Sequence, residues 1–208
     1  MKFSLGQENT FCVSLDSRWP AMQERLERLG IPCTRWKASL PDETYEIFAP
    51  HLNKFQQACA QSHVCLWREM LRRDLPYVFI MEDDVLFSHN WREILESFDL
   101  VDDEAWDLVL LNASEAMSPE DTWLPCTHQW LTGAYILSRK GAKWLLANFP
   151  EKWEADWMTW CLQDQGHAYA HFPWPVIQEG LDTTIGSDVQ ANKAKVLSLL
   201  GERVSNYS

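Results

Sequence analysis

The sequence has no long apolar segment, no excess of basic residues and no paired cysteine motif. No window of its 208 residues approaches the ~20 apolar residues that a membrane-spanning helix requires. Residues 1–11 are mixed and polar, whereas a secretory signal has an apolar centre. The formal net charge of −12 comes without any basic stripe, which disfavours binding to nucleic acid. We therefore expect a cytoplasmic protein with at most peripheral contact at the inner face of a membrane.

The cysteines do not form a disulfide or zinc pattern. All six are scattered through apolar surroundings, as is typical of reduced, buried thiols. Cys59 and His63 would share a face of a helix, but Cys65 would lie away from it and no fourth ligand is near. This spacing argues against a zinc site made of these three residues.

Strand-like and helix-like segments alternate along the chain, which predicts an α/β fold. With 46 % hydrophobic residues, the chain can bury one core, so residues 1–208 should form a single domain in which 191–208 are a C-terminal helix and tail. Strands are expected at 10–15, 32–38, 77–84, 106–111 and 132–137, and helices at 19–29, 53–73, 91–98 and from 139 onward. This order predicts a mostly parallel sheet covered by helices on both faces, with ligands beyond the carboxyl ends of the strands.

Two segments do not match a regular element. Residues 113–131 are expected to form a long loop, which could act as a lid. Residues 171–190 contain Pro173, Pro175, Gly180 and Gly186, so we expect them to wrap irregularly over the edge of the sheet.

Three adjacent carboxylates follow a continuous apolar run. The run begins at Tyr77, and Glu82, Asp83 and Asp84 come at its end. Side chains alternate along a strand, so Glu82 and Asp84 should face one side and Asp83 the other. Because burying ionised carboxylates without a counter-charge is costly, we expect Glu82 and Asp84 to share a divalent cation. The alternative is an ordinary strand end followed by a solvated acidic turn.

Five blocks of the sequence, in this order, resemble bacterial glycosyltransferase family 25, the lipooligosaccharide glycosyltransferases. They are Val13–Arg18, Trp36–Ala38, Ala58–His63, Ile80–Val85 and Thr132–Ala142. The resemblance spans roughly residues 10–190. It implies one nucleotide-sugar-binding domain of the GT-A type, a divalent metal that is usually Mn²⁺ (or Mg²⁺), and transfer of a sugar, often galactose from UDP-galactose. The family commonly has a second arginine soon after the first block, but here the next one is Arg25.

The resemblance also assigns candidate residues to the donor site. It places Thr132 and Gly133 there, and Gln178 resembles a family glutamine near the donor. Arg18 could assist with the nucleotide phosphates, or it could be a solvated arginine in the first turn of a helix. His63 could reach the donor, although a lone helical histidine is more often structural. Asp83 could hold the ribose or the end of the strand.

Asp156 is the candidate catalytic base. An inverting transferase needs one group to take the proton of the acceptor hydroxyl, and the resemblance places an acid here. Apolar neighbours would raise the pKa of Asp156 toward a useful value. Alternatively, Asp156 only caps a helix, and Asp164 is then the reserve. Trp123, Trp130, Trp153 and Trp157 flank loops and acids, so they are candidates to stack on an acceptor sugar.

Together with the acidic strand end, the resemblance implies a metal-dependent hexosyltransferase similar to a β-1,4-galactosyltransferase. That the transfer inverts the sugar is implied by the resemblance alone. The partners of this enzyme would be a nucleotide sugar and an oligosaccharide or lipid-linked saccharide acceptor. Two other functions stay open. One is a metal-dependent phosphohydrolase, for which Asp16 and Asp107 would be the additional acids. The other is a catalytically inactive protein that binds a sugar nucleotide.

Overall fold

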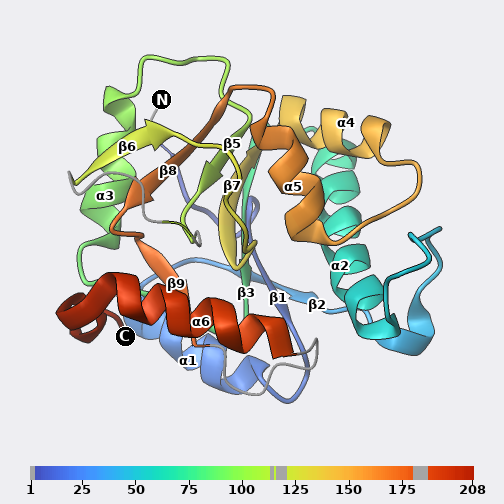
Figure 1. The fold of residues 1–208 in the computed structure, drawn as a ribbon, viewed down its shortest axis with the longest axis horizontal. Helices are drawn as coiled ribbons and strands as arrows, with labels where there is room; N and C mark the ends of the chain where they lie inside the picture. The colour runs from blue at the N-terminus through green and yellow to red at the C-terminus, as the bar shows by residue number, and fades with distance from the viewer. Residues whose placement is uncertain (1–2, 113–114, 116–120, 180–186) are drawn as a thin grey trace.

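A computed structural model describes residues 3–112, 115, 121–179 and 187–208 of the chain (Figure 1). A seven-stranded sheet has the order β2-β1-β3-β7-β5-β8-β6, and β4 and β9 form a separate two-stranded ribbon. The strands are β1 Thr10–Ser14, β2 Thr34–Lys37, β3 Tyr77–Glu82, β4 Val85–Phe87, β5 Leu108–Leu110, β6 Thr122–Pro125, β7 Ala134–Ser138, β8 Ala168–Phe172 and β9 Val176–Gln178.

The helices alternate with strands from β1 to β3, as expected, whereas further along the chain β7 follows β6, β9 follows β8 and α5 follows α4 directly. The helices are α1 Trp19–Leu29, α2 Lys54–Arg72, α3 Trp91–Ser97, α4 Arg139–Asn148, α5 Ala155–Gln163 and α6 Ser187–Leu200, with short 3₁₀ turns at Pro41–Glu43, Phe98–Leu100 and Gly201–Asn206. Local signals set several boundaries. Asn53 caps α2 by accepting hydrogen bonds from the N–H groups of Phe55 and Gln56, and Gly30 ends α1 in the left-handed conformation. No helix in the described ranges has the length and apolarity that crossing a bilayer would require.

Helices cover both faces of the sheet, as expected. On β3, Val78 and Ile80 pack in one buried cluster together with residues of α2, α4 and α5. Phe79 and Met81 point to the other face and pack with residues of α1 and α3. Strand β3 is therefore buried on both sides, which explains its continuous apolar sequence.

The sheet is mixed, and the expected predominance of parallel pairing is not confirmed. Among the described strands, the pairs β1–β2, β1–β3 and β5–β8 are parallel, whereas β3–β7, β5–β7 and β6–β8 are antiparallel. The reversal arises because β7 enters between β3 and β5. As a result, the segment that leads into β7 lies beside the carboxyl end of β3.

Two segments expected to be irregular contain strands. Within 113–131, the described residues include the edge strand β6, and residues 113–114 and 116–120, on which the lid hypothesis also rests, lie outside the described part. Within 171–190, β8 ends at Phe172 and β9 pairs antiparallel with β4. Both expectations were wrong because strands of three or four residues carry little periodicity, and only their pairing partners identify them.

Candidate active site at the carboxyl end of strand β3

The carboxylate cluster, defined as Glu82, Asp83 and Asp84, lies where β3 ends. Glu82 is the last residue of β3, and the chain turns at Asp83 and Asp84 before β4 begins at Val85. The backbone N–H of Glu82 donates to the carbonyl of Gly133, 2.8 Å away. The cluster is therefore held between β3, the ribbon β4–β9 and the segment before β7.

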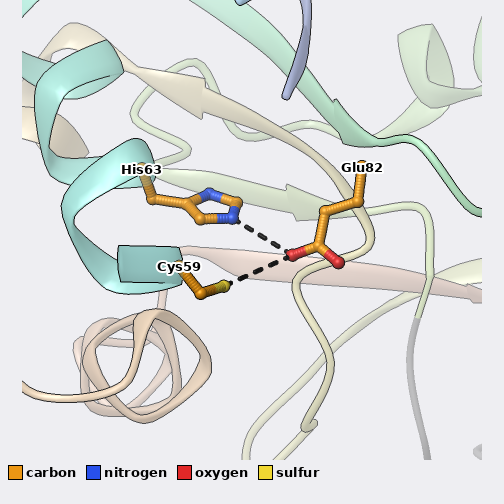
Figure 2. A group of neighbouring side chains, drawn as sticks. All are labelled: Cys59, His63 and Glu82. Atoms are coloured by element: carbon orange, nitrogen blue, oxygen red, sulfur yellow. Dashed lines mark hydrogen bonds and ion pairs between the residues drawn. The ribbon is translucent and has the colours of Figure 1, made fainter. Parts of the chain in front are cut away.

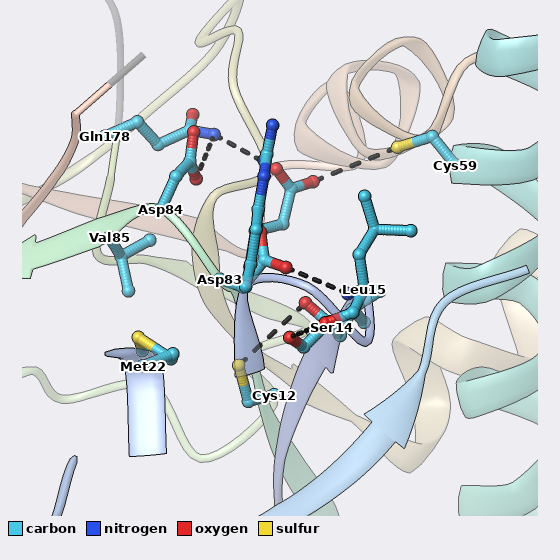
Figure 3. A network of polar contacts seen from close by, with 12 residues as sticks. Cys12, Ser14, Leu15, Met22, Cys59, Asp83, Asp84, Val85 and Gln178 are labelled. Carbon is cyan, nitrogen blue, oxygen red and sulfur yellow. Dashed lines mark hydrogen bonds and ion pairs between the residues drawn. The ribbon is translucent and has the colours of Figure 1, made fainter. Parts of the chain in front are cut away.

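Asp83 points away from the other two carboxylates, toward the end of β1. Its Oδ2 accepts a hydrogen bond of 2.9 Å from the backbone N–H of Leu15, and its Oδ1 lies 3.3 Å from Nη1 of Arg18 (Figure 3). Since the side chain is only 8 % exposed, these contacts satisfy much of its buried charge. Asp83 thereby ties the turn after β3 to the loop between β1 and α1, and Arg18 is paired rather than simply solvated.

Glu82 and Asp84 converge on the same amide. The Nε2 group of Gln178, the last residue of β9, donates to Oε2 of Glu82 at 3.0 Å and to Oδ1 of Asp84 at 3.2 Å (Figure 3). An amide N–H₂ group carries partial positive charge, so it occupies the place between two carboxylates where a cation would be most stable. The geometry thus brings Gln178 to the pair of carboxylates that the sequence predicted to lie together.

The pKa of Asp84 indicates that two negative charges are unfavourable at this pair. Burial raises the pKa of the Asp84 carboxyl to about 7, and the negative charge of Glu82 adds to this rise, although the amide of Gln178 partly offsets it. Two carboxylates so close together favour a bound cation, because a positive charge would allow both to stay ionised. Their oxygen donors suit a hard ion such as Mn²⁺ or Mg²⁺.

Gly133 is required by this arrangement. A Cβ atom at this position would lie 2.5 Å from Cδ of Gln178, which is closer than atoms can approach without a shift. The Gln178 amide can therefore lie against residue 133 only if that residue has no side chain. Thr132, beside it, is buried in the same segment.

His63 belongs to a buried chain of hydrogen bonds that ends at Glu82. The indole N–H of Trp67 donates to the Tyr135 hydroxyl at 2.9 Å, Tyr135 lies 2.8 Å from Nδ1 of His63, and His63 Nε2 lies 3.2 Å from Oε1 of Glu82. Because the Tyr135 oxygen accepts from Trp67, its own proton can point to Nδ1, which leaves the proton of His63 on Nε2 to donate to Glu82. His63 is fully buried and orients Glu82 in this way.

Asp156 lies in the first turn of α5 and is not its N-cap. The N-cap is Glu154, and Oδ1 of Asp156 accepts only a local bond of 3.0 Å from the N–H of Trp157. Burial raises the pKa of Asp156 to about 6, with the charges of Glu154 and Glu82 contributing. The influence of Glu82 places Asp156 within the electric field of the carboxylate cluster. Asp164, at the other end of α5, lies 3.4 Å from His128.

Three candidate tryptophans pack together with Trp160 in an aromatic row, defined as Trp130, Trp153, Trp157 and Trp160. The rings of Trp157 and Trp160 stack with centroids 4.8 Å apart, and Trp153 stacks on Trp157 at 6.0 Å. Trp130 packs against Trp157 and Trp160, at 5.8 and 6.0 Å. Among the described residues, Trp157 thus has three indole neighbours, while Trp153 has one indole neighbour and the ring of His51, whose centroid is 4.9 Å away.

Trp123 lies elsewhere, so its proposed contact with an acceptor is not supported. Its ring is 7 % exposed and packs edge-on against Phe98, and its indole N–H donates to the carbonyl of Ile94 at 3.0 Å. An indole that is buried with its polar group satisfied is a core residue. The sequence did not distinguish Trp123 from the others because it too stands beside a loop.

The sequence analysis did not select Tyr135, Trp67 or Trp160. Tyr135 stands among the apolar residues of β7, so the sequence does not distinguish it from the core. That it faces α2 follows only from the order of the strands. Trp160 follows Trp157 by three residues, and this helical spacing could have identified it. Cys65, by contrast, behaves as expected: its sulfur lies 3.0 Å from the hydroxyl of Tyr45 and not in a group with Cys59 and His63.

Comparison with known proteins identifies relatives along much of the chain. The family model described as glycosyltransferase family 25 (LPS biosynthesis protein) matches residues 8–125. The lacto-N-neotetraose biosynthesis glycosyltransferase LgtE of Neisseria meningitidis serogroup B is 30 % identical over 161 residues, which cover 62 % of this chain and 57 % of that protein. The inactive glycosyltransferase 25 family member 3 of Mus musculus is 35 % identical over 109 residues, which cover 48 % of this chain and 18 % of that protein.

The comparison with solved structures gives a match of low similarity. It is a glycosyltransferase involved in the glycosylation of the major capsid of PBCV-1, with 8 % identity and a TM-score of 0.43 over 89 % of this chain and 97 % of that one. The chain spans little more than half the length of the bacterial relative LgtE.

Proposed function

The chain belongs to glycosyltransferase family 25, and from this premise we propose that it is a metal-dependent, inverting glycosyltransferase. The proposed donor is a UDP-hexose, with UDP-galactose as the first choice, and the acceptor is a hydroxyl of a lipooligosaccharide or a similar surface glycan. The observation that carries the proposal is the convergence of Glu82 and Asp84 on the amide of Gln178. The likeness to a protein named for lacto-N-neotetraose biosynthesis supports the acceptor class.

The residues present fit a divalent cation that would bridge protein and nucleotide. Glu82 and Asp84 supply carboxylate oxygens, and rotation of the Gln178 amide would present its carbonyl oxygen in place of the N–H₂ group. When bound, Mn²⁺ or Mg²⁺ supplies positive charge that stabilises the diphosphate leaving group. The need for such charge is plain in a protein whose net charge is −12.

Other residues of this chain would bind and orient the donor. Arg18 is partly exposed beside Asp83 and would contact the nucleotide phosphates, while Asp83 anchors the loop that carries Arg18. Thr132 and Gly133 would form the floor beneath Gln178. His63 is fully buried, so we propose that it acts through Glu82 and not by touching the donor.

Asp156 would accept the proton of the attacking hydroxyl. A carboxylate whose pKa is raised to about 6 is a stronger base than an ordinary aspartate, yet it is still mostly ionised at neutral pH. Attack of the hydroxyl on the anomeric carbon, from the face opposite the diphosphate, then inverts the configuration at that carbon. Trp153 and Trp130 are the proposed contacts for the acceptor, because the neighbours of Trp157 cover more of its faces.

The second candidate function is binding of a sugar nucleotide without turnover. It is favoured by the likeness to a protein named an inactive member of the family, which aligns with nearly half of the chain. The phosphohydrolase alternative loses support. Asp16 is 71 % exposed and pairs with Arg35. Asp107 precedes β5, at the opposite end of the strands from Glu82, where it pairs with Lys140. Neither acid joins the carboxylate cluster.

Calorimetric titration of UDP with and without Mn²⁺ tests the proposal. We expect binding that depends on Mn²⁺ and that weakens by about a hundredfold or more in Asp84→Asn, because even outer partners of a metal site change affinity 10–100-fold. Asp164→Asn is the matched control, since Asp164 is an aspartate outside the carboxylate cluster.

The outcomes separate the candidate functions. Binding of UDP-galactose followed by transfer to an acceptor glycan supports the transferase. Metal-dependent binding without transfer to any glycan tested supports the inactive binding protein. If UDP binds in neither condition, or binds Asp84→Asn equally well, the nucleotide-sugar site at the end of β3 is refuted.

A further inference from the structure

A second set of possible metal ligands lies on the other side of Glu82. Cys59 and His63 are one turn apart on α2, and both point toward Oε1 of Glu82 (Figure 2). The Cys59 sulfur lies 3.9 Å from this oxygen and His63 Nε2 lies 3.2 Å from it. One ligand atom from each of the three residues falls within 4.8 Å of the others.

These separations suit a small tetrahedral ion with mixed ligands. Tetrahedral Zn²⁺ with bonds of ~2.0–2.1 Å to nitrogen and oxygen and ~2.3 Å to sulfur separates its N and O ligands by about 3.3 Å and its S and O ligands by about 3.5 Å. The spacings at Oε1 of Glu82 lie within a few tenths of an ångström of these values. Small side-chain rotations would therefore be sufficient to enclose an ion.

The surroundings of His63 support a ligand role. A histidine that binds a metal through one ring nitrogen needs a partner for the N–H of the other. Here Nδ1 lies 2.8 Å from the Tyr135 hydroxyl, whose oxygen has two lone pairs and can accept from both Trp67 and His63. Binding of the ion would therefore move the His63 proton from Nε2, where it otherwise donates to Glu82, to Nδ1, so that the lone pair of Nε2 faces the ion.

The electric field at the site also favours a cation. Glu82 supplies a carboxylate to the donor set itself, and Asp84 contacts the same Gln178 amide as Glu82. A carboxylate, an imidazole and a thiol are moreover the mixture that zinc and cadmium accept, whereas Mn²⁺ and Mg²⁺ prefer oxygen. The chemistry of the donor set thus differs from that of Glu82 and Asp84 alone.

We propose that Cys59 Sγ, His63 Nε2 and Glu82 Oε1 form a binding site for a thiophilic divalent cation of the zinc class, with the fourth position open to water. Binding releases the thiol proton of Cys59 to solvent and changes no oxidation state. Because Glu82 is shared, an ion here competes with the cation that Glu82 and Asp84 would hold. This competition, but not the binding itself, rests on the proposed function.

Titration of the metal-free protein with Cd²⁺ tests the site directly, because a thiolate–cadmium bond absorbs in the ultraviolet. We expect one equivalent of Cd²⁺ to give this band in the unmodified protein, and Zn²⁺ to displace it. Cys59→Ser should abolish the band, and His63→Gln should weaken binding by about tenfold or more. Cys65→Ser is the matched control, since Cys65 is another half-buried cysteine of α2 whose sulfur contacts Tyr45.

The readouts distinguish failure of this site from failure of the proposed function. A band that persists in Cys59→Ser, or that is lost equally in Cys65→Ser, refutes the site, and circular dichroism checks that each variant is folded. Mn²⁺-dependent binding of UDP is measured separately in the same samples. Loss of UDP binding on addition of one equivalent of Zn²⁺, with recovery in Cys59→Ser, would establish the competition, and unchanged UDP binding would refute it.

Discussion

The carboxylate cluster and the aromatic row are built in opposite ways. The cluster draws partners from α2, β1 and β9, and the hydrogen bond between Gln178 and Glu82 joins residues 96 positions apart. The row is mostly local, because Trp153, Trp157 and Trp160 follow one another at helical spacing beside or within α5. A substitution in the cluster should therefore disturb several elements, whereas the effect of a substitution in the row should stay confined to the surroundings of α5.

Asp156 lies in α5 next to Trp157 of the aromatic row and feels the charge of Glu82, and replacing it should have the largest effect. Asp156→Asn is expected to lower kcat for sugar transfer by about 10²–10⁴, the usual contribution of a general base, while Mn²⁺-dependent UDP binding stays unchanged. Activity of the unmodified protein should rise with pH as Asp156 ionises around pH 6 and then level off. A fall in activity above neutral pH would point to an acid such as histidine instead.

The same variant should be more stable than the parent at neutral pH. Burial raises the pKa of Asp156, so the folded state holds this proton more tightly than the unfolded chain, and the carboxylate costs stability once it ionises. Thermal unfolding at pH 4 and pH 7.5 checks the sign, because the difference between variant and parent should grow with pH. An equal difference at both values would contradict the assignment.

Trp123→Ala sharpens the distinction between the core and the aromatic row. We expect a loss of about 3–5 kcal/mol in the free energy of unfolding, because a buried aromatic ring is removed and the carbonyl of Ile94 loses a donor. Urea unfolding measures this loss. The KM for acceptor should not change at temperatures where the variant is folded. A raised KM would indicate that Trp123 does contact the acceptor.

Gly133→Ala should displace Gln178 from the carboxylate cluster without replacing any charged residue. The new methyl group would meet Gln178 at 2.5 Å, so the amide must leave its place between Glu82 and Asp84. We expect a cost of about 1–3 kcal/mol in stability, together with weaker Mn²⁺-dependent UDP binding in calorimetry. Gly141→Ala is a matched control, because its Cβ would clash with the carbonyl of Asp107 at 2.7 Å, at the end of the strands opposite to the carboxylate cluster. Equal UDP affinities in the two variants would contradict this role of Gly133.

Trp153→Ala should have the smallest effect. Loss of one aromatic face is worth about 0.5–1.5 kcal/mol, which corresponds to a severalfold rise in the KM for acceptor. The KM for the donor should not change. Trp144→Ala serves as the control, since Trp144 is a half-buried tryptophan of α4 that packs on Phe149. If both variants change acceptor kinetics equally, the aromatic row is not the acceptor surface.

Most elements could be predicted from sequence because their signals are local. The strand beginning at Thr10, the helix ended by Gly30 and the helix capped by Asn53 lie within one or two residues of their expected bounds. The short strands β6 and β9 could not be predicted, since pairing alone defines them. The position of β7 between β3 and β5 was also missed, because periodicity does not give the order of strands.

The sequence by itself determined that a buried strand would deliver three carboxylates, and that five blocks would resemble one family. The opposite orientations of Asp83 and Asp84 also followed from simple alternation. Only the tertiary structure decided which partners these carboxylates meet: Leu15 for Asp83, Gln178 for Asp84, and His63 for Glu82. The physical reason is that alternation is a property of neighbouring residues, whereas a hydrogen bond between distant segments depends on how the whole sheet is assembled.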